Sequence, residues 1–253
     1  MVLSLFPAAV GVLVTVALAG AATLLKALTP AAGATAAVFG SIVVVVAGYP
    51  FLGLMVLFVF ASVLATRYGF EEKRQKGVHE GTEGERGVSN VLAHVIVPTA
   101  LVLFAAAFPA RLSTTGLALL YTAALAFGAS DTFASEFGVL AGKAVSILTL
   151  RPVAPGTNGG ISALGEGWAL MGAFTTALFG LGLFVLFGTA RPGVATLLAI
   201  ATVSGFLACQ VDSVVGEVLE NRGWLTKGTT NLLGMTSSMA IAAVLFVAVG
   251  GAL

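Results

Sequence analysis

The sequence predicts an all-α polytopic membrane protein, on three observations. Of its 253 residues, 58% are hydrophobic and only 9% are charged, whereas a soluble domain carries about 25% charged residues. The mean hydropathy is +1.05. Apolar segments of about 20 residues, the length that crosses a bilayer as a helix, recur along the chain. The composition therefore excludes a water-soluble globular enzyme, a disordered chain and a nucleic-acid-binding protein.

About eight segments are expected to cross the membrane, in one transmembrane domain that covers residues 1–253. Short interruptions at Lys26, Thr29–Pro30 and Gly48–Pro50 separate the first three, so two long helices could replace them, and the expected number ranges from six to eight. No positive charge precedes the first segment, which predicts a retained helix rather than a cleaved signal peptide. The segments are Leu3–Leu25, Ala31–Ala47, Pro50–Ala65, Val91–Phe108, Leu112–Ser130, Gly167–Gly188, Gly193–Val211 and Leu232–Gly251.

The loops between these segments fall into two sets by charge. The even-numbered loops contain only Arg111 and Arg191, and the odd-numbered loops contain the other basic residues. Because Lys and Arg mark the cytoplasmic side of membrane proteins, we expect a charged cytoplasmic loop at 67–89 and a glycine-rich cytoplasmic loop at 132–166. The basic residues of the odd loops are Lys26, Arg67, Lys73, Arg74, Lys76, Arg86, Lys143, Arg151, Arg222 and Lys227.

All the acidic residues lie in the odd loops or at the helix ends that face them. A pump or channel more often distributes ionisable groups along a path through the membrane. Polar chemistry concentrated at one surface instead favours a site at the cytoplasmic interface, where a soluble substrate and a lipid head group can meet.

Two predicted helix ends resemble each other. One reads Asp131-Thr-x-x-Ser135-Glu136 and the other Asp212-Ser-x-x-Gly216-Glu217. Both leave the membrane on the same side, which is consistent with a parallel internal repeat of two-helix units.

A carboxylate at the end of a membrane helix is costly unless it has a partner. If Asp131 and Asp212 converge, a cation between them would relieve their repulsion. Mg²⁺ suits such a position, because it binds carboxylates together with substrate phosphates. The alternative is that each aspartate caps its helix or pairs with Lys143 or Lys227.

The loop between the two acidic ends contains the run Gly156-Thr157-Asn158-Gly159-Gly160. Glycines permit positive φ angles, so such a run can turn several N–H groups toward an anion. Thr157, Asn158 and Ser162 add donors, and Lys143 and Arg151 add positive charge. The next helix would point its positive N-terminal end to the same place. A flexible turn between helices would look similar, and the run is not a Walker loop.

The remaining polar candidates lie in the other two charged loops. Arg222 and Lys227 can hold phosphates, and Asn231 is either a ligand or a helix cap. Loop 67–89 is interpreted mostly as a solvated linker, with Arg86 and Asn90 its best candidates. His79 and His94 are too few for a familiar zinc or haem site, and Cys209 is expected to be a buried, inert thiol.

The motifs Asp131-Thr-x-Ala-Ser135-Glu136-x-Gly138, Pro155-Gly-Thr-Asn-Gly-Gly160-x-Ser162-x-x-Gly165 and Asp212-Ser-x-x-Gly216 resemble the integral-membrane family that includes plant phytyl-phosphate kinase. The chain is more distantly similar to phytol and dolichol kinases and to CDP-diacylglycerol synthase. The resemblance runs from about Thr66 to Asn231. His94 stands where the family pattern leads us to expect asparagine.

The resemblance implies Mg²⁺-dependent phosphoryl transfer from a nucleoside triphosphate, with CTP one candidate, to phytyl or geranylgeranyl phosphate. A monophosphate acceptor is already an anion, so alignment and charge neutralisation suffice without a base. In this interpretation Asp131 and Asp212 hold Mg²⁺, and Glu136 or Glu217 is either a further ligand or a group that orients the ligands from behind. The phosphates are assigned to Lys143, Arg151, Gly156, Thr157, Asn158, Gly159, Gly160, Ser162, Arg222, Lys227 and Asn231, with Ser135, Glu166, Arg86 and Asn90 as secondary candidates.

Two other functions remain open from the sequence. A cytidylyltransferase that makes a CDP-activated lipid would use the same groups but direct attack at the α-phosphate. A transporter or scaffold would use the acidic helix ends for an ion path and would turn over no triphosphate. The sequence does not indicate the nucleotide, the lipid chain length or the oligomeric state.

Overall fold

A computed structural model describes residues 4–188 and 193–253, and it confirms the all-α polytopic class. Within these residues, eight helices are long and apolar enough to cross a membrane. They are accompanied by the short helix α4 (Phe70–Gln75) and by a π-helical turn, η1 (Gly216–Glu220). The long helices are α1 (Leu5–Leu24), α2 (Pro30–Ala47), α3 (Tyr49–Arg67), α5 (Val88–Ala107), α6 (Thr114–Gly138), α7 (Ala163–Leu186), α8 (Val194–Val215) and α9 (Lys227–Ala248).

The N-terminal apolar stretch forms three helices rather than two long ones. Pro30 occupies the first turn of α2, and the Thr29 hydroxyl accepts a hydrogen bond from the N–H of Ala32 at 3.3 Å. Gly48, with φ of 97°, separates α2 from α3, and Pro50 follows in the first turn of α3. Proline at a helix start and glycine beyond a helix end explain why the chain reverses twice here.

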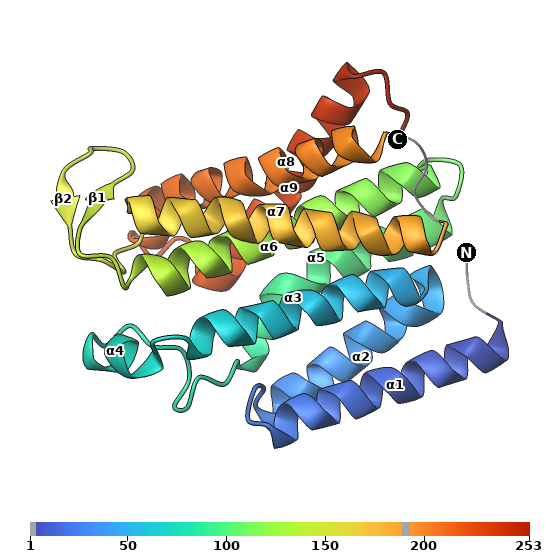
Figure 1. Cartoon of the computed structure of the whole chain (residues 1–253), viewed down its shortest axis with the longest axis horizontal. Helices are drawn as coiled ribbons and strands as arrows, with labels where there is room; N and C mark the ends of the chain where they lie inside the picture. Colours follow the sequence, from blue (N-terminus) through green and yellow to red (C-terminus); the bar gives the residue numbers. More distant parts are fainter. Residues whose placement is uncertain (1–3, 189–192) are drawn as a thin grey trace.

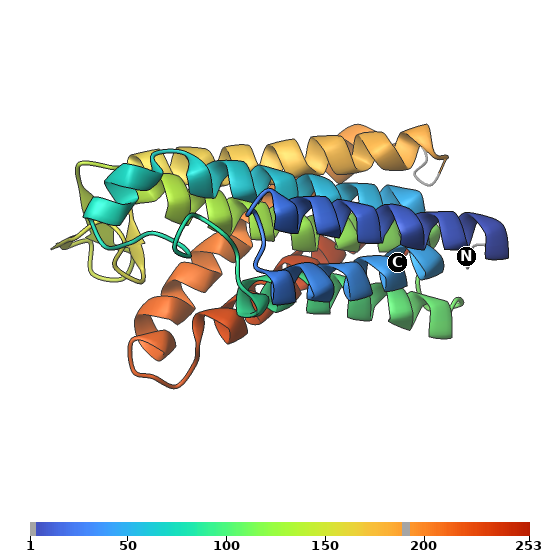
Figure 2. The same cartoon turned by 90° about the horizontal axis from the view of Figure 1, so that it is seen from below.

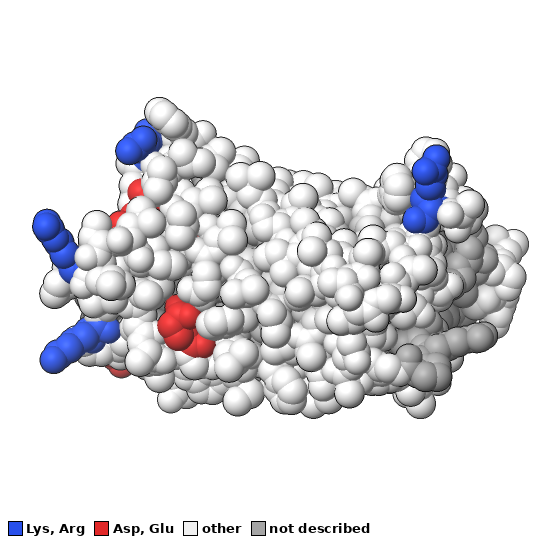
Figure 3. Space-filling model, turned by 90° about the horizontal axis from the view of Figure 1, so that it is seen from above, with Lys and Arg blue, Asp and Glu red and all other residues white. Residues whose placement is uncertain are grey.

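The long helices alternate in direction, so the odd-numbered loops lie together at one end of the bundle (Figure 1). We call this the charged end; it carries α4 and the short strands. On the face in Figure 3, acidic side chains lie only toward this end, and the surface between the two ends is almost free of charge. The predicted grouping of the loops agrees with this arrangement. Leu3 and Arg191 lie outside the described residues.

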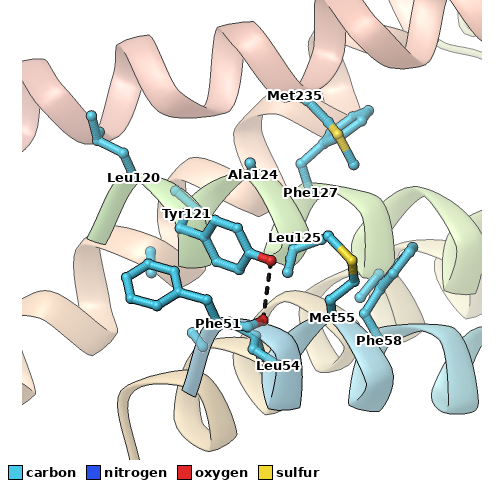
Figure 4. Packing of buried hydrophobic residues seen from close by; sticks show 14 of the residues in the cluster. Phe51, Leu54, Met55, Phe58, Leu120, Tyr121, Ala124, Leu125, Phe127 and Met235 are labelled. Atoms are coloured by element: carbon cyan, nitrogen blue, oxygen red, sulfur yellow. Dashed lines mark hydrogen bonds between the residues drawn. The ribbon is translucent and has the colours of Figure 1, made fainter. Parts of the chain in front are cut away.

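Helix α6 occupies the centre of the bundle. In its most apolar stretch of 18 residues, 83% of the residues are buried. Phe51 and Tyr121 pack edge-on with ring centroids 4.9 Å apart, and the Tyr121 hydroxyl donates to the Phe51 carbonyl oxygen at 3.1 Å (Figure 4). Helix α8 approaches α6 closely at Gly205, where an added Cβ would lie 2.8 Å from the backbone of Ala126. Small residues thus let the helices that carry the two aspartate motifs touch directly.

Six helices extend by two or more residues beyond the predicted spans at the charged end: α3 and α5 by two or three, α7 by four, and α6, α9 and α8 with η1 by more. Helix α6 continues from Ser130 to Gly138, and α8 continues through η1 to Glu220. Helix α9 begins at Lys227, where Thr226 and Thr229 form a capping box. Apolarity ends where the chain reaches the interface, but backbone hydrogen bonding continues into water. The glycine-rich loop is therefore residues 139–162 rather than 132–166.

This loop folds into a small antiparallel sheet. Strand β1 (Ala144–Ser146) lies between β2 (Pro152–Val153) and β3 (Gly160–Ile161). Val145 pairs with Pro152 on one side and with Ile161 on the other. The sheet projects from the charged end and brings the glycine run back toward the ends of α6 and α8 (Figures 1 and 2).

Candidate functional site

A cavity of about 370 Å³ opens at the charged end, between the ends of α6, α8 and α9 and the glycine-rich loop. We call it the polar cavity. Most of the predicted site residues line it although they come from four separate segments. They are Asp131, Ser135, Glu136, Gly156, Thr157, Asn158, Gly159, Gly160, Ser162, Glu166, Asp212, Lys227 and Asn231.

Asp131 and Asp212 reach the polar cavity from helices that run in the same direction and pack on each other. No hydrogen bond or ion pair in the described part of the chain involves either carboxylate, and Oδ1 of Asp212 is buried without a partner. The two charges act on each other, and Lys227 is the strongest positive influence on Asp131. Two carboxylates that share one cavity at a membrane boundary and have no hydrogen-bond partner among the described residues call for a ligand.

The donor set fits Mg²⁺. This ion typically binds one or two protein carboxylates and completes its shell with water and substrate phosphates, and Asp131 and Asp212 provide two. Within residues 4–188 and 193–253, no group of three or more His, Cys, Asp and Glu side chains is arranged to enclose a metal ion. Mg²⁺ at this pair would complete its shell with water and substrate oxygens.

The glycine run forms a tight turn at the rim of the polar cavity. Gly156 and Gly159 have φ angles of 90° and 76°. Two of its N–H groups are used inside the fold, since Thr157 donates to Ala154 O at 3.1 Å and Gly160 donates to Thr157 O at 2.8 Å. The anion nest is thus smaller than the sequence predicts. The Ser162 hydroxyl accepts from Gly165 N at 3.0 Å and caps α7, so the positive end of that helix faces the cavity.

We expect Gly159→Ala to disturb the site without unfolding the protein. Alanine at a positive φ costs about 1 kcal/mol, and its Cβ would also collide with the Glu217 side chain. Gly142 in the same loop has no heavy atom within 4 Å of an added Cβ. Nucleotide binding to both variants can be measured by isothermal titration: weaker binding is expected for Gly159→Ala and wild-type binding for Gly142→Ala. Equal binding by the two variants would remove the glycine turn from the site.

Glu136 lies in a buried ionic cluster at the wall of the polar cavity. Its Oε2 accepts from Lys73 Nζ at 2.8 Å, and its Oε1 accepts from the Thr66 hydroxyl at 2.6 Å. Arg86 donates to that hydroxyl at 2.8 Å and lies 3.8 Å from Glu136. Burial lowers the pKa of the Arg86 guanidinium and Glu136 acts in the opposite direction, but arginine stays charged in proteins.

Lys73 was assigned to a solvated linker, and this is wrong: its side chain is fully buried. It lies in α4, and its ammonium also donates to the carbonyl oxygens of Ala65 and Thr66 at the end of α3. The only sequence signal was Phe70 three residues earlier, which places an apolar side chain on the same face of a short helix. Such spacing is too common in charged loops to be diagnostic.

Several predicted residues lie away from the polar cavity. Lys143, Arg151 and Arg222 are exposed outside its lining, and Arg222 stacks on the Trp224 ring at 5.6 Å. Glu217 also lies outside the lining, and its Oε1 accepts from the Ser146 hydroxyl at 2.7 Å. Arg86 and Asn90 line a different cavity. Of the four predicted phosphate-binding cations, the structure brings only Lys227 to the aspartates.

Other cavity residues were not predicted, chiefly Glu80, His79 and Glu220. Glu220 accepts from Asn158 Nδ2 at 3.0 Å and from the Thr230 hydroxyl at 3.2 Å, and so ties the glycine turn to α9. Glu220 follows Glu217 by three residues, which places both on one face of a helix. This signal was missed because the predicted span ended at Val211. His79 also lines the cavity, so an imidazole is present near the place where an alcohol acceptor would need a base.

Comparison with known proteins gives relatives over most of the chain. The family described as "Integral membrane protein DUF92" matches residues 13–249, a range that includes every residue lining the polar cavity. An uncharacterized membrane protein of Methanocaldococcus jannaschii is 33% identical over 199 residues, which is 78% of this chain and 76% of that protein. One from Synechocystis is 33% identical over 221 residues, 86% and 82% of the two chains. Protein PGR of Arabidopsis thaliana is 25% identical over 197 residues, 70% and 67%. No solved structure matches.

Proposed function

This chain belongs to the DUF92 family of integral membrane proteins, and we propose that it is a Mg²⁺-dependent kinase that transfers a phosphoryl group from a nucleoside triphosphate to an isoprenoid monophosphate. The single observation that carries the proposal is the convergence of Asp131, Asp212, Lys227 and the glycine turn on one polar cavity at the charged end. By the distribution of Lys and Arg, this end faces the cytoplasm, where nucleotides are dissolved.

The proposed step is an in-line displacement. An oxygen of the acceptor monophosphate attacks the γ-phosphorus, the bond from that phosphorus to the β–γ bridging oxygen breaks, and the nucleoside diphosphate leaves. The acceptor oxygen is already anionic, so no proton must be removed. Bound Mg²⁺ would neutralise charge on the phosphates.

The chain's own residues would supply position and charge. Asp131 and Asp212 would hold the metal ion, and Lys227 would contact a phosphate, since no acidic side chain in the described residues forms an ion pair with it. The glycine turn and the start of α7 would face the triphosphate. Lys143, Arg151, Arg222 and Glu217 stay predicted contributors, although they lie outside the lining of the polar cavity.

The test is product analysis with the full chain in detergent. Geranylgeranyl phosphate or the corresponding alcohol is incubated with Mg²⁺ and each of CTP, ATP, GTP and UTP. Release of a nucleoside diphosphate together with geranylgeranyl diphosphate is expected. Release of pyrophosphate would identify a cytidylyltransferase, phosphorylation of the alcohol alone would change the acceptor, and no turnover with any nucleotide would favour a transporter or scaffold. Each of these three results would overturn the proposal.

A further inference from the structure

A second cavity, of about 330 Å³, lies between α1, α2, α3 and α5. We call it the apolar cavity. Aliphatic and aromatic side chains form most of its wall, including Ala36, Met55 and Val95. Leu18, Phe60 and Leu64 also line it and are 43%, 60% and 54% exposed. These three belong to spanning helices, so the cavity opens sideways toward the lipid.

One end of the apolar cavity is polar. Ser62, Arg86 and His94 line it there and are only 1%, 5% and 3% exposed. Each has a buried polar atom without a partner, namely Oγ of Ser62, Nε of Arg86 and Nε2 of His94. Buried polar groups are normally paired. None of these three atoms is itself exposed to the cavity, so a small rotation of the side chains would be needed for a polar group at this end to pair with them.

Hydrogen bonds to Asn90 and to the backbone fix the positions of the Arg86 and His94 side chains. Arg86 donates to Asn90 Oδ1 at 2.7 Å and to Ser62 O at 3.3 Å, and His94 Nδ1 lies 2.8 Å from Asn90 O. Arg67 and Arg86 are the charged residues among those lining the cavity, and no acidic residue lines it. The polar end therefore favours an anion.

Arg86 and Asn90 also form the partition between the two cavities. Arg86 lies 3.8 Å from Glu136, and Asn90 Nδ2 donates to Glu80 at 3.4 Å. Glu136 and Glu80 line the polar cavity. An anionic head at Arg86 would thus be one layer of side chains from the aspartates.

We propose that the apolar cavity binds a single-chain amphiphile with an anionic phosphate head, the tail among α1, α2, α3 and α5 and the head at Ser62, Arg86 and His94. A volume at the lower limit of small-molecule pockets suits one hydrocarbon chain rather than two. That this amphiphile is the phosphoryl acceptor rests on the proposed function; that it binds here does not.

Binding is tested with radiolabelled hexadecyl phosphate on the full chain in nanodiscs, without nucleotide. Ala36→Phe, which fills the cavity, is expected to weaken binding at least tenfold, whereas Ala34→Phe on the exposed side of α2 should bind as wild type. Ser62→Ala should weaken binding about fivefold, the loss of one hydrogen bond. Thr99→Val removes another buried, unpartnered hydroxyl, outside the cavity, and should have no effect.

Wild-type affinity in both Ala36→Phe and Ser62→Ala would overturn the inference, as would equal competition by hexadecanol or by dipalmitoyl phosphatidic acid. Thermal unfolding in detergent shows whether Ala36→Phe is folded, and Ser62→Ala gives the answer if it is not. Turnover of geranylgeranyl phosphate is measured separately. Binding without turnover would contradict the kinase alone, and turnover unaffected by either substitution would contradict only this assignment of the acceptor.

Discussion

Asp131→Asn and Asp212→Asn are each expected to lower phosphoryl transfer by at least about 10²–10³-fold, the usual effect of losing one preorganised electrostatic group. Asparagine keeps the size of the side chain but cannot supply a charged ligand to Mg²⁺. The two carboxylates act on each other and have no hydrogen-bond partner among residues 4–188 and 193–253, so removing one relieves repulsion. Stability should therefore be equal to or higher than that of the wild type while turnover disappears, a combination typical of functional sites.

The measurement is the initial rate of nucleoside diphosphate release at several Mg²⁺ concentrations, together with the melting temperature in detergent. Glu83→Gln is the matched control, because Glu83 is an acidic residue at the same end that pairs with Lys26 on the surface at 2.8 Å. It should keep the wild-type rate. A wild-type rate in either aspartate variant would show that the pair does not hold the metal.

Glu136→Gln is expected to destabilise the protein by about 3–5 kcal/mol, the cost of leaving buried charges unpaired. The substitution leaves the fully buried Lys73 without its carboxylate, which lies 2.8 Å away, and leaves Arg86 without the acidic group 3.8 Å away. Adding Lys73→Met to this variant should restore much of the stability, because both members of the pair are then uncharged. The melting temperature in detergent should fall by on the order of 10 °C in the single variant and partly recover in the double variant.

The exposed pair of Glu72 and Lys76, at 2.7 Å, provides the control, because surface ion pairs contribute little. Glu72→Gln should change the melting temperature by no more than the error of the measurement. If Glu136→Gln melts like the wild type but turns over no substrate, Glu136 acts in catalysis rather than in holding α3, α4 and α6 together. The sequence placed Glu136 beside the predicted metal, and this pair of measurements separates a role in the reaction from a role in stability.

The sequence predicted the fold well because the bilayer limits the choices. A spanning segment must satisfy its backbone internally, so apolar length alone indicates a helix. Hydropathy located every long helix but ended α6 at Ser130 and α8 at Val211, several residues before the helices stop at Gly138 and Val215. The extensions contain carboxylates and are still helical. Hydropathy detects apolar residues only, so it ends a helix where the first polar residues appear.

The polar cavity was predictable in its centre but not at its edge. The repeated motif placed Asp131 and Asp212 on parallel helix ends, so their convergence followed from topology. Lys143, Arg151 and Arg222 were chosen for charge and proximity in sequence. The loop sheet directs Lys143 and Arg151 elsewhere, and Arg222 lies in the turn between η1 and α9. Which of several exposed cations meets a carboxylate depends on loop conformation, and each surface pair contributes too little energy to leave a reliable trace in the sequence.

The amino-acid sequence alone determined that this protein lies in a membrane, with all its acidic and most of its basic residues at one end of a helical bundle. The reason is that transfer of apolar and charged groups between water and lipid depends on composition and order. Only the tertiary structure decided that Lys73 is buried against Glu136, that Lys227 rather than Arg222 joins the aspartates, and that a second cavity reaches Arg86. These depend on distances between helices, which packing sets and which no local pattern encodes.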